Sequence, residues 1–208
     1  MTNYREIAEL PIVTQPPYRF SNLAHICINT MTELRGHTYP QQSIKMNTKE
    51  IKKFQKLLHQ WYEKHKRPMP WRETNDPYKI WVSEVMLQQT QVNTVIPYYI
   101  KFLKQFPNLK SLAEASQHDV IKVWEGLGYY ARARNLHRAT QKVVHEYQNQ
   151  IPGNIADFQR LPGVGRYIAA AVLSIAFDVP LAVVDGNVKR VLARLFRIEE
   201  PANKTSSA

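Results

Sequence analysis

The hydrophobic residues from position 46 onward recur every three to four positions, the spacing of an α-helix with one buried face. No stretch alternates apolar and polar residues over more than a few positions, as a half-buried β-strand would. Short segments containing glycine or proline separate the periodic stretches. The pattern therefore predicts an all-α fold with short loops and no internal repeat.

Helix start signals place individual helices on this pattern. Thr48 is in position to cap the first helix, and the pair Asp76-Pro77 is typical of the start of the second, which should end near "QQTQ". Ser111 and Glu114 have the spacing of a capping box. Further helices are expected, in chain order, over "VIPYYIKFLKQF", "QHDVIKVWEGL", "ARARNLHRATQKVVHEY", "IADFQRL", "RYIAAAVLSIAF" and the basic segment "VKRVLARL".

Residues 1–45 lack the apolar spacing of the rest of the chain. Four prolines interrupt residues 1–45, and no helical period holds there, so we predict an N-terminal extension of uncertain structure. Residues 46–200 are the predicted folded region, and residues 201–208 are a short tail.

Net charge narrows the choice of partner. The chain carries a formal charge of +11, and from Met46 onward it holds 24 basic residues against 14 acidic ones. Such an excess favours a polyanionic partner, with nucleic acid the first candidate. The alternative is a basic protein without such a partner. A hydrophobic content of 44% excludes an intrinsically disordered chain.

Cys27 is the only cysteine, so an intramolecular disulfide is impossible and a zinc or iron–sulfur site built from cysteines is not expected. A reducing compartment follows, cytoplasmic in a bacterium and nuclear or mitochondrial in a eukaryote. The first 20 residues lack the apolar core of a signal peptide. No apolar run reaches the roughly 18 residues of a membrane span.

One aspartate interrupts an apolar run in "VVDGNVKRVLARL", immediately before a basic amphipathic segment. Asp185 is well placed as a helix N-cap, because its carboxylate can accept hydrogen bonds from free backbone amides. The positive end of a helix also keeps a carboxylate ionised, as chemistry that needs a fixed anion requires. The segment by itself leaves both interpretations open.

A second acidic residue, Glu84, lies in "WVSEVMLQQTQV" beside an apolar stripe that includes Trp81 and Val85, off the centre of that stripe. The ordinary interpretation is a solvated glutamate on a helix surface. Within an aromatic-walled cleft its pKa would instead rise, as a general acid requires.

Two glycine-containing segments have the composition of nucleic-acid contacts. "LPGVG", from Leu161 to Gly165, is a very short connection between two helices whose outward backbone amides could bind a phosphate; its other interpretation is a tight turn without a ligand. "GLGYYARARN", Gly126 to Asn135, combines aromatic rings with guanidinium groups, which suits unstacked bases and phosphates. Core and surface packing is the alternative there.

Taken in order, five motifs resemble the MutY-type adenine DNA glycosylases of the helix-hairpin-helix glycosylase superfamily. They are "PMPWR", "PYKIWVSEVMLQQTQV", "WEGLGYYARARNL", "LPGVGRYIAAAVLSIAF" and "VVDGNVKRVLARLF", within about Met46 to Glu200. The resemblance implies a six-helix bundle with an incomplete second helical domain, and a helix-hairpin-helix at about 155–177. It also implies a monomer that binds duplex DNA and removes adenine paired with 8-oxoguanine or guanine.

The resemblance assigns roles to individual residues. Glu84 matches the catalytic acid and Asp185 the catalytic aspartate, with Tyr167 and Asn187 positioning these groups. The remaining matches are DNA contacts: Arg72 in the adenine pocket, Gln89 and Tyr129, which enter the duplex where the adenine leaves it, Leu87 and Thr90 in the same lesion-facing loop, Gly163, Val164 and Gly165 in the hairpin, and Lys189, which matches a lysine that can trap the abasic product. The alternative for Lys189 is a phosphate contact.

Tyr167 separates this chain from a relative. The endonuclease III branch has a nucleophilic lysine at that point after "GVGR", so tyrosine implies a monofunctional glycosylase. The family also carries a four-iron–four-sulfur cluster, but this chain stops at "ANKTSSA" without its cysteine ligands, and we expect no cluster here. Two alternatives remain: a catalytically inactive DNA-binding remnant, or a regulatory fragment of such an enzyme.

Overall fold

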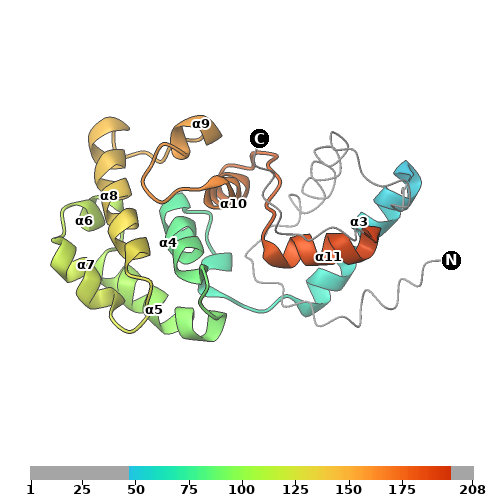
Figure 1. Ribbon diagram of the computed structural model, residues 1–208, viewed down its shortest axis with the longest axis horizontal. Coiled ribbons are helices and arrows are strands. Elements are labelled where there is room, and N and C mark those ends of the chain that lie inside the picture. Colours follow the sequence, from blue (N-terminus) through green and yellow to red (C-terminus); the bar gives the residue numbers. More distant parts are fainter. Residues whose placement is uncertain (1–46, 198–208) are drawn as a thin grey trace.

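Every regular element that the structure describes is helical, as the apolar spacing predicts. The structure is a computed structural model, described here over residues 47–197 (Figure 1). In chain order the elements are α3 (Thr48–His65), the 3-10 turn η1 (Pro70–Arg72), α4 (Pro77–Leu87), α5 (Val92–Gln105), α6 (Leu109–Ala113), α7 (Gln117–Trp124), α8 (Ala131–Glu146), α9 (Ile155–Phe158), α10 (Arg166–Ala176) and α11 (Gly186–Phe196). The predictions for Cys27, for the N-terminal extension of residues 1–45 and for the tail of residues 201–208 lie outside the described residues.

Helices α4 to α10 form one packed unit, which we call the helical body. Helix α4 lies at its centre and contacts α5, α8 and α10, while α6 and α7 pack on α8 (Figure 1). Aromatic rings fill the interior: Phe102 meets Trp124 and Phe106 edge-to-face, with ring centroids 5.8 and 5.0 Å apart. The periodic apolar residues of these helices are the core of the protein.

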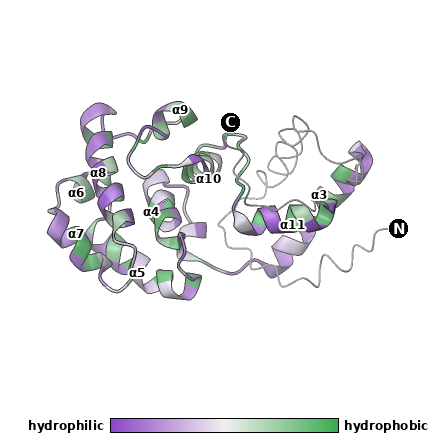
Figure 2. Ribbon diagram, viewed as in Figure 1, coloured by the Kyte–Doolittle hydropathy of each residue, from purple (hydrophilic) through white to green (hydrophobic). Residues whose placement is uncertain are grey.

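Helices α3 and α11 lie at the other end of the molecule from α6, α7 and α8 (Figure 1). No residue of α3 is buried, and in α11 only Phe196 is. Both helices nevertheless carry apolar as well as polar residues along their length (Figure 2). The apolar period of their sequences correctly predicts two helices, but these helices are not part of the core of the helical body. Within residues 47–197, no helix combines the length and apolarity that crossing a membrane would require.

The helix caps confirm one prediction and correct another. Asp76 caps α4 as predicted, its Oδ1 accepting from the backbone N–H of Tyr78 at 2.9 Å. The cap of α3 is Asn47, one residue before the predicted Thr48. Asn47 Oδ1 accepts from the Glu50 amide at 3.0 Å, and the Glu50 carboxylate accepts from the Asn47 amide at 2.8 Å. This capping box satisfies two backbone donors reciprocally, which Thr48 could not do from inside the helix.

The predicted capping box of Ser111 with Glu114 is wrong. Asn108 is the cap of α6 and Ser111 is its third residue, so the box lies three positions earlier, with Ser111 N donating to Asn108 Oδ1 at 2.9 Å. Asparagine ranks among the best cap residues, and this register buries the leucines of the short helix. Helix α5 also begins earlier than predicted, at Val92.

Candidate functional site

Glu84 lies in the middle of α4 and is only 1% exposed. Every residue from Ile80 to Met86 is buried, because α5, α8 and α10 contact this helix. A single apolar stripe therefore does not describe α4, and the interpretation of Glu84 as a solvated surface glutamate is wrong. A buried carboxyl must either find hydrogen-bond partners or take up a proton.

The pKa of Glu84 reflects that environment. The pKa of this carboxyl is raised from its ordinary value of 4.5 to about 7. Removal from water is the main cause, a side-chain hydrogen bond from Tyr167 opposes the rise, and the nearby charge of Asp185 adds to it. Among the described residues, Oε1 of Glu84 has no hydrogen-bond partner. The group therefore holds a proton for much of the time near neutral pH, and one of its oxygens has unused hydrogen-bonding capacity.

Tyr167 reaches Glu84 because its helix lies on α4. Gly165 is the N-cap of α10, so Tyr167 occupies the second position of that helix. Helix α10 packs along α4, and its buried residues include three consecutive alanines, Ala169, Ala170 and Ala171. Small residues let two helices approach closely, which brings the first turn of α10 to the carboxyl on α4.

Asp185 is a helix cap, as one of its two interpretations predicted. Its Oδ1 accepts from the Val188 amide at 2.7 Å, and its Oδ2 accepts from the Asn187 side chain at 3.1 Å. The Arg190 guanidinium donates in turn to Asn187 Oδ1. Both oxygens are held by residues within one turn of the same helix, and the carboxylate raises the pKa of Glu84. The two carboxyls therefore interact electrostatically, and the cap does not exclude a catalytic role.

The residues matched to duplex entry lie on two neighbouring loops. Leu87 is the last residue of α4, and Gln89 follows with a φ of 55°, its side chain exposed. Thr90 is half-buried, its hydroxyl donating to the Gln88 carbonyl at 3.3 Å. Tyr129, in the loop before α8, has a φ of 48° and is 60% exposed. Both matched side chains, Gln89 and Tyr129, are therefore available to a partner.

Arg132 joins these loops, a role that sequence reasoning missed. Its guanidinium donates to Gln88 O at 2.6 Å and to Thr90 Oγ1 at 3.2 Å on one loop, and to Gly128 O at 3.2 Å on the other. Of the two interpretations of the motif "GLGYYARARN", the one in which its side chains pack within the protein describes this arginine. Its inward position depends on carbonyls more than 40 positions away in the sequence, so no local pattern could reveal it.

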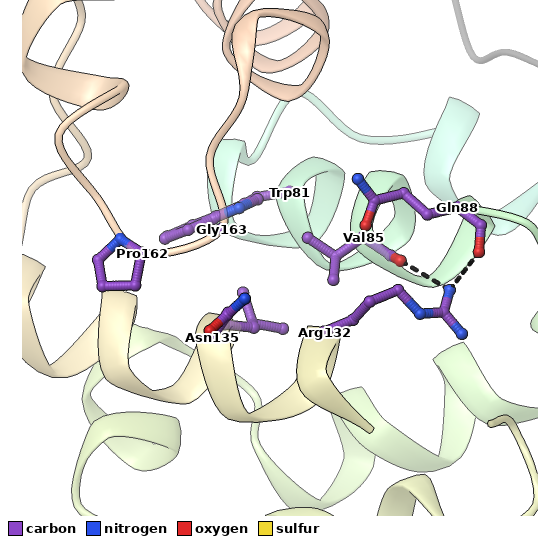
Figure 3. A pocket seen from close by; sticks show the side chains of 8 residues that line it. Trp81, Val85, Gln88, Arg132, Asn135, Pro162 and Gly163 are labelled. Carbon is purple, nitrogen blue, oxygen red and sulfur yellow. Dashed lines mark hydrogen bonds between the residues drawn. The ribbon is translucent and has the colours of Figure 1, made fainter. Parts of the chain in front are cut away.

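The hairpin only partly fits the prediction of outward amides. Val164 is buried, and its amide donates to Leu161 O at 3.1 Å, so that amide is not free for a phosphate. Gly163 and Gly165 are exposed, and Gly163 has a φ of 74°. The hairpin, α4 and α8 together line a small pocket that includes Trp81 and Asn135 (Figure 3).

Arg72 and Lys189 lie on different elements. Arg72 belongs to η1, where its Nη1 donates to the Arg67 carbonyl at 2.7 Å and its guanidinium lies 5.7 Å from the centre of the Tyr62 ring. Lys189 is exposed on α11, and its amide bonds to Asp185 O at 3.0 Å, one turn away. Lys189 therefore lies one helical turn from the Asp185 carboxylate.

The residues present do not fit an iron–sulfur cluster. Over residues 47–197 no group of three or more His, Cys, Asp or Glu side chains could hold a metal ion. The single cysteine of the sequence cannot supply four thiolates. The expected absence of a cluster remains a prediction.

Comparisons with known proteins agree on one family. Residues 82–208 match the HhH-GPD superfamily of base excision DNA repair proteins. The chain is 48% identical over 167 residues to an adenine DNA glycosylase of Rattus norvegicus, 46% over 165 residues to one of Homo sapiens, and 41% over 145 residues to one of Buchnera aphidicola subsp. Baizongia pistaciae. These matches cover 76%, 75% and 70% of this chain, but only 32%, 30% and 41% of the relatives.

Solved structures show the same fold. A thermostable thymine-DNA glycosylase superposes with a TM-score of 0.67 at 29% identity, over 72% of this chain and 70% of that one. A trapped endonuclease III–DNA covalent intermediate superposes with a TM-score of 0.65 at 20% identity, over 76% of this chain and 74% of that one. The latter identity is low, so that similarity concerns the fold alone.

Proposed function

The chain belongs to the HhH-GPD superfamily of base excision DNA repair proteins, and on that premise we propose that it is an adenine DNA glycosylase. It would hydrolyse the N-glycosidic bond of adenine paired with 8-oxoguanine or guanine in duplex DNA. Relatives of that name, 41–48% identical to this chain, support the proposal. We further propose that residues 46–200 are the catalytic region and that the protein acts as a monomer.

DNA binding rests on charge and on exposed loops. The excess of basic residues from position 46 onward favours a polyanion bound through its phosphates. The exposed glycines Gly163 and Gly165 of the hairpin, with no side-chain cap on α10, leave the start of that helix available to a phosphate. Gln89 and Tyr129 would enter the duplex, offsetting the few kcal/mol that extruding a base costs. Thr90 and Leu87 would lie beside them.

Glu84 is suited to the role of general acid. A carboxyl with a pKa of about 7 carries a proton to donate in neutral solution, whereas an ordinary glutamate does not. Its Oε1, which has no partner among the described residues, is the atom that would face a ring nitrogen of the extruded adenine. Protonation there makes adenine a better leaving group. The hydrogen bond from Tyr167 would hold the carboxyl in position.

Asp185 would stabilise the sugar from which adenine departs. As adenine leaves, positive charge develops on the sugar, and an anion fixed beside it lowers the barrier directly or through a transient covalent bond. The Val188 amide and the Asn187 side chain hold the carboxylate in one orientation. Water then completes hydrolysis, so the two carboxyls divide the work of acid and anion.

Whether the protein also cleaves the DNA strand depends on two residues, Tyr167 in the first turn of α10 and Lys189 in the first turn of α11. Position 167 is tyrosine, which cannot act as an amine nucleophile, so base removal without strand cleavage is the proposed outcome. Lys189 is the amine near Asp185, and it would contact a phosphate or trap the abasic product after the base has left. Arg72, on η1, would border the adenine pocket.

One observation supports the proposal most: Glu84 is buried with a pKa of about 7, and that pKa is affected by the charge of Asp185, a second carboxylate fixed at a helix N-terminus. The alternative is a DNA-binding protein without catalysis. The sparse packing of α11, where only Phe196 is buried, favours it, because an active site needs Asp185 held rigidly.

The test is single-turnover adenine release from duplexes containing A:8-oxoguanine, A:G or A:T pairs. We expect release from the first two, with strand breaks appearing only after alkali treatment. Glu84→Gln, which keeps shape and removes the proton donor, should bind the duplex but release adenine about a hundred- to thousandfold more slowly. DNA binding by the parent without any release would leave the non-catalytic alternative.

A further inference from the structure

We propose that Arg132 is a positioning residue that fixes the loop carrying Gln89 and the loop carrying Tyr129 relative to each other, so that both side chains enter the duplex together. This inference rests on the proposed function, because it concerns how the DNA-facing loops act. Arg132 itself is turned inward and half-buried, so it is assigned no contact with DNA.

One side of the guanidinium closes the end of α4. Nη1 donates to the carbonyls of Val85 at 3.0 Å, Met86 at 2.8 Å and Gln88 at 2.6 Å, two of which are visible in Figure 3. The last carbonyls of a helix lack intrahelical partners, and a cationic donor satisfies them well. Nη2 adds the Thr90 hydroxyl at 3.2 Å, which extends the contact beyond the helix into the loop.

The same group also holds the second loop. Nη2 donates to Gly128 O at 3.2 Å, and the guanidinium lies 5.5 Å from the centre of the Trp124 ring and 5.3 Å from that of Tyr129. The Trp124 indole donates to Gly128 O at 3.1 Å. The guanidinium plane therefore contacts carbonyls and a hydroxyl on two loops about 40 residues apart in the sequence, and aromatic rings at the end of α7 and in the second loop.

Backbone conformation shows why such a contact is needed. Gln89 and Tyr129 both have positive φ, 55° and 48°, in the left-handed region that residues other than glycine seldom occupy. Conformations of this kind persist only where the surroundings determine them. Each strained residue lies within one to three positions of a group that Arg132 binds. Arg132 is thus the element common to both strained sites.

A lysine at position 132 could not make the same set of contacts. A guanidinium is a planar fork that donates in several fixed directions, whereas an ammonium is a compact point charge. Arg132→Lys should keep a charge near the end of α4 but release the Gly128 loop. Burial lowers the pKa of Arg132, with the charge of Tyr129 opposing the shift, yet an arginine in a protein stays protonated.

The experiment follows base unstacking directly, in a Glu84→Gln background, where slow adenine release leaves time to observe unstacking before the base is lost. A 2-aminopurine beside the target adenine gains fluorescence when the stack opens. We expect Arg132→Lys and Arg132→Met to slow this rise by at least about tenfold at saturating protein. Lys142→Gln is the matched control: it removes one charge from α8, where Lys142 pairs with Glu146 at 3.6 Å on the surface, and should leave the rise unchanged.

A double-mutant comparison separates positioning from mere stabilisation. In a Gln89→Ala, Tyr129→Ala background, Arg132→Lys should have no further effect on unstacking, because the side chains it positions are gone. An equal loss in both backgrounds, or an unaltered rise in a folded Arg132→Lys variant, would overturn the proposal. The unstacking signal does not require adenine release, so a parent that unstacks DNA but never releases adenine would count against the proposed enzyme and not against Arg132.

Discussion

The helical body and the helix α11 hold their carboxyls in different ways. Glu84 is fixed by its surroundings: helices α5, α8 and α10 contact its own helix, and burial gives it a pKa of about 7. Asp185 is fixed by its neighbours in sequence, through bonds to Val188 and Asn187 in the first turn of α11. Only Phe196 of that helix is buried.

This difference matches what each group would have to do. A proton donor must be shielded from water, because desolvation is what raises the pKa of a carboxyl. An anion must stay charged, and a helix N-terminus stabilises the charged form without removing it from water. Dense packing suits the first requirement, while a local cap suits the second.

The largest expected effect is on stability within the body. Phe102→Ala should lower the free energy of unfolding by about 3–5 kcal/mol, because Phe102 is completely buried between aromatic rings. Leu57→Ala, on α3, where the leucine is 41% exposed, should cost well under half of that. Urea denaturation of both variants measures the difference. Equal losses would mean that the two regions are packed alike.

A smaller effect concerns pH. The folded-state pKa of Glu84 is raised from 4.5 to about 7, so between these values the folded protein binds a proton that the unfolded chain does not. Stability should therefore fall by about 3 kcal/mol as pH rises from about 5 to about 8. Glu84→Gln removes this term, so its stability curve should fall less over the same window. Parallel curves for the two proteins would show that Glu84 is not desolvated.

The smallest expected effect is at the hairpin. Gly163→Ala should cost about 1–3 kcal/mol, because a φ of 74° strains any side chain and the added Cβ would lie 2.7 Å from Cβ of Asn135. Gly165→Ala is the matched control two positions away, with a φ of −82° and open space around it. Thermal denaturation should show the first variant clearly less stable than the second. Similar melting temperatures would show that α8 does not constrain the hairpin.

Sequence alone predicts the helices because their apolar period and their caps are local properties. Asp76 with Pro77 marks the start of α4, and Asp185 marks that of α11. The errors occur where two polar residues compete for one cap, as Asn47 does with Thr48 and Asn108 with Ser111. Choosing between such neighbours depends on which register buries the apolar side chains, and that is a tertiary property.

The candidate site is less accessible to sequence reasoning. Resemblance marks Glu84 and Asp185, but the apolar pattern alone put Glu84 beside a stripe, since α4 is buried on all sides and no periodicity remains visible. Nothing in the sequence indicates the role of Arg132, because most of its partners are carbonyl oxygens, which every residue possesses. Contacts with backbone groups a few positions away, such as the caps, leave a signal in the sequence, whereas contacts with backbone groups far along the chain do not.

The most direct test of the two-carboxyl account is single-turnover adenine release by the Asp185→Asn variant. Asparagine caps helices about as well as aspartate, so the fold of α11 and DNA binding should both survive. Loss of the anion should slow release by roughly a hundred- to thousandfold, equivalent to about 3–4 kcal/mol of barrier. Circular dichroism and duplex binding by the same preparation serve as controls. A rate within a few-fold of the parent would leave Asp185 as a helix cap only and contradict the account.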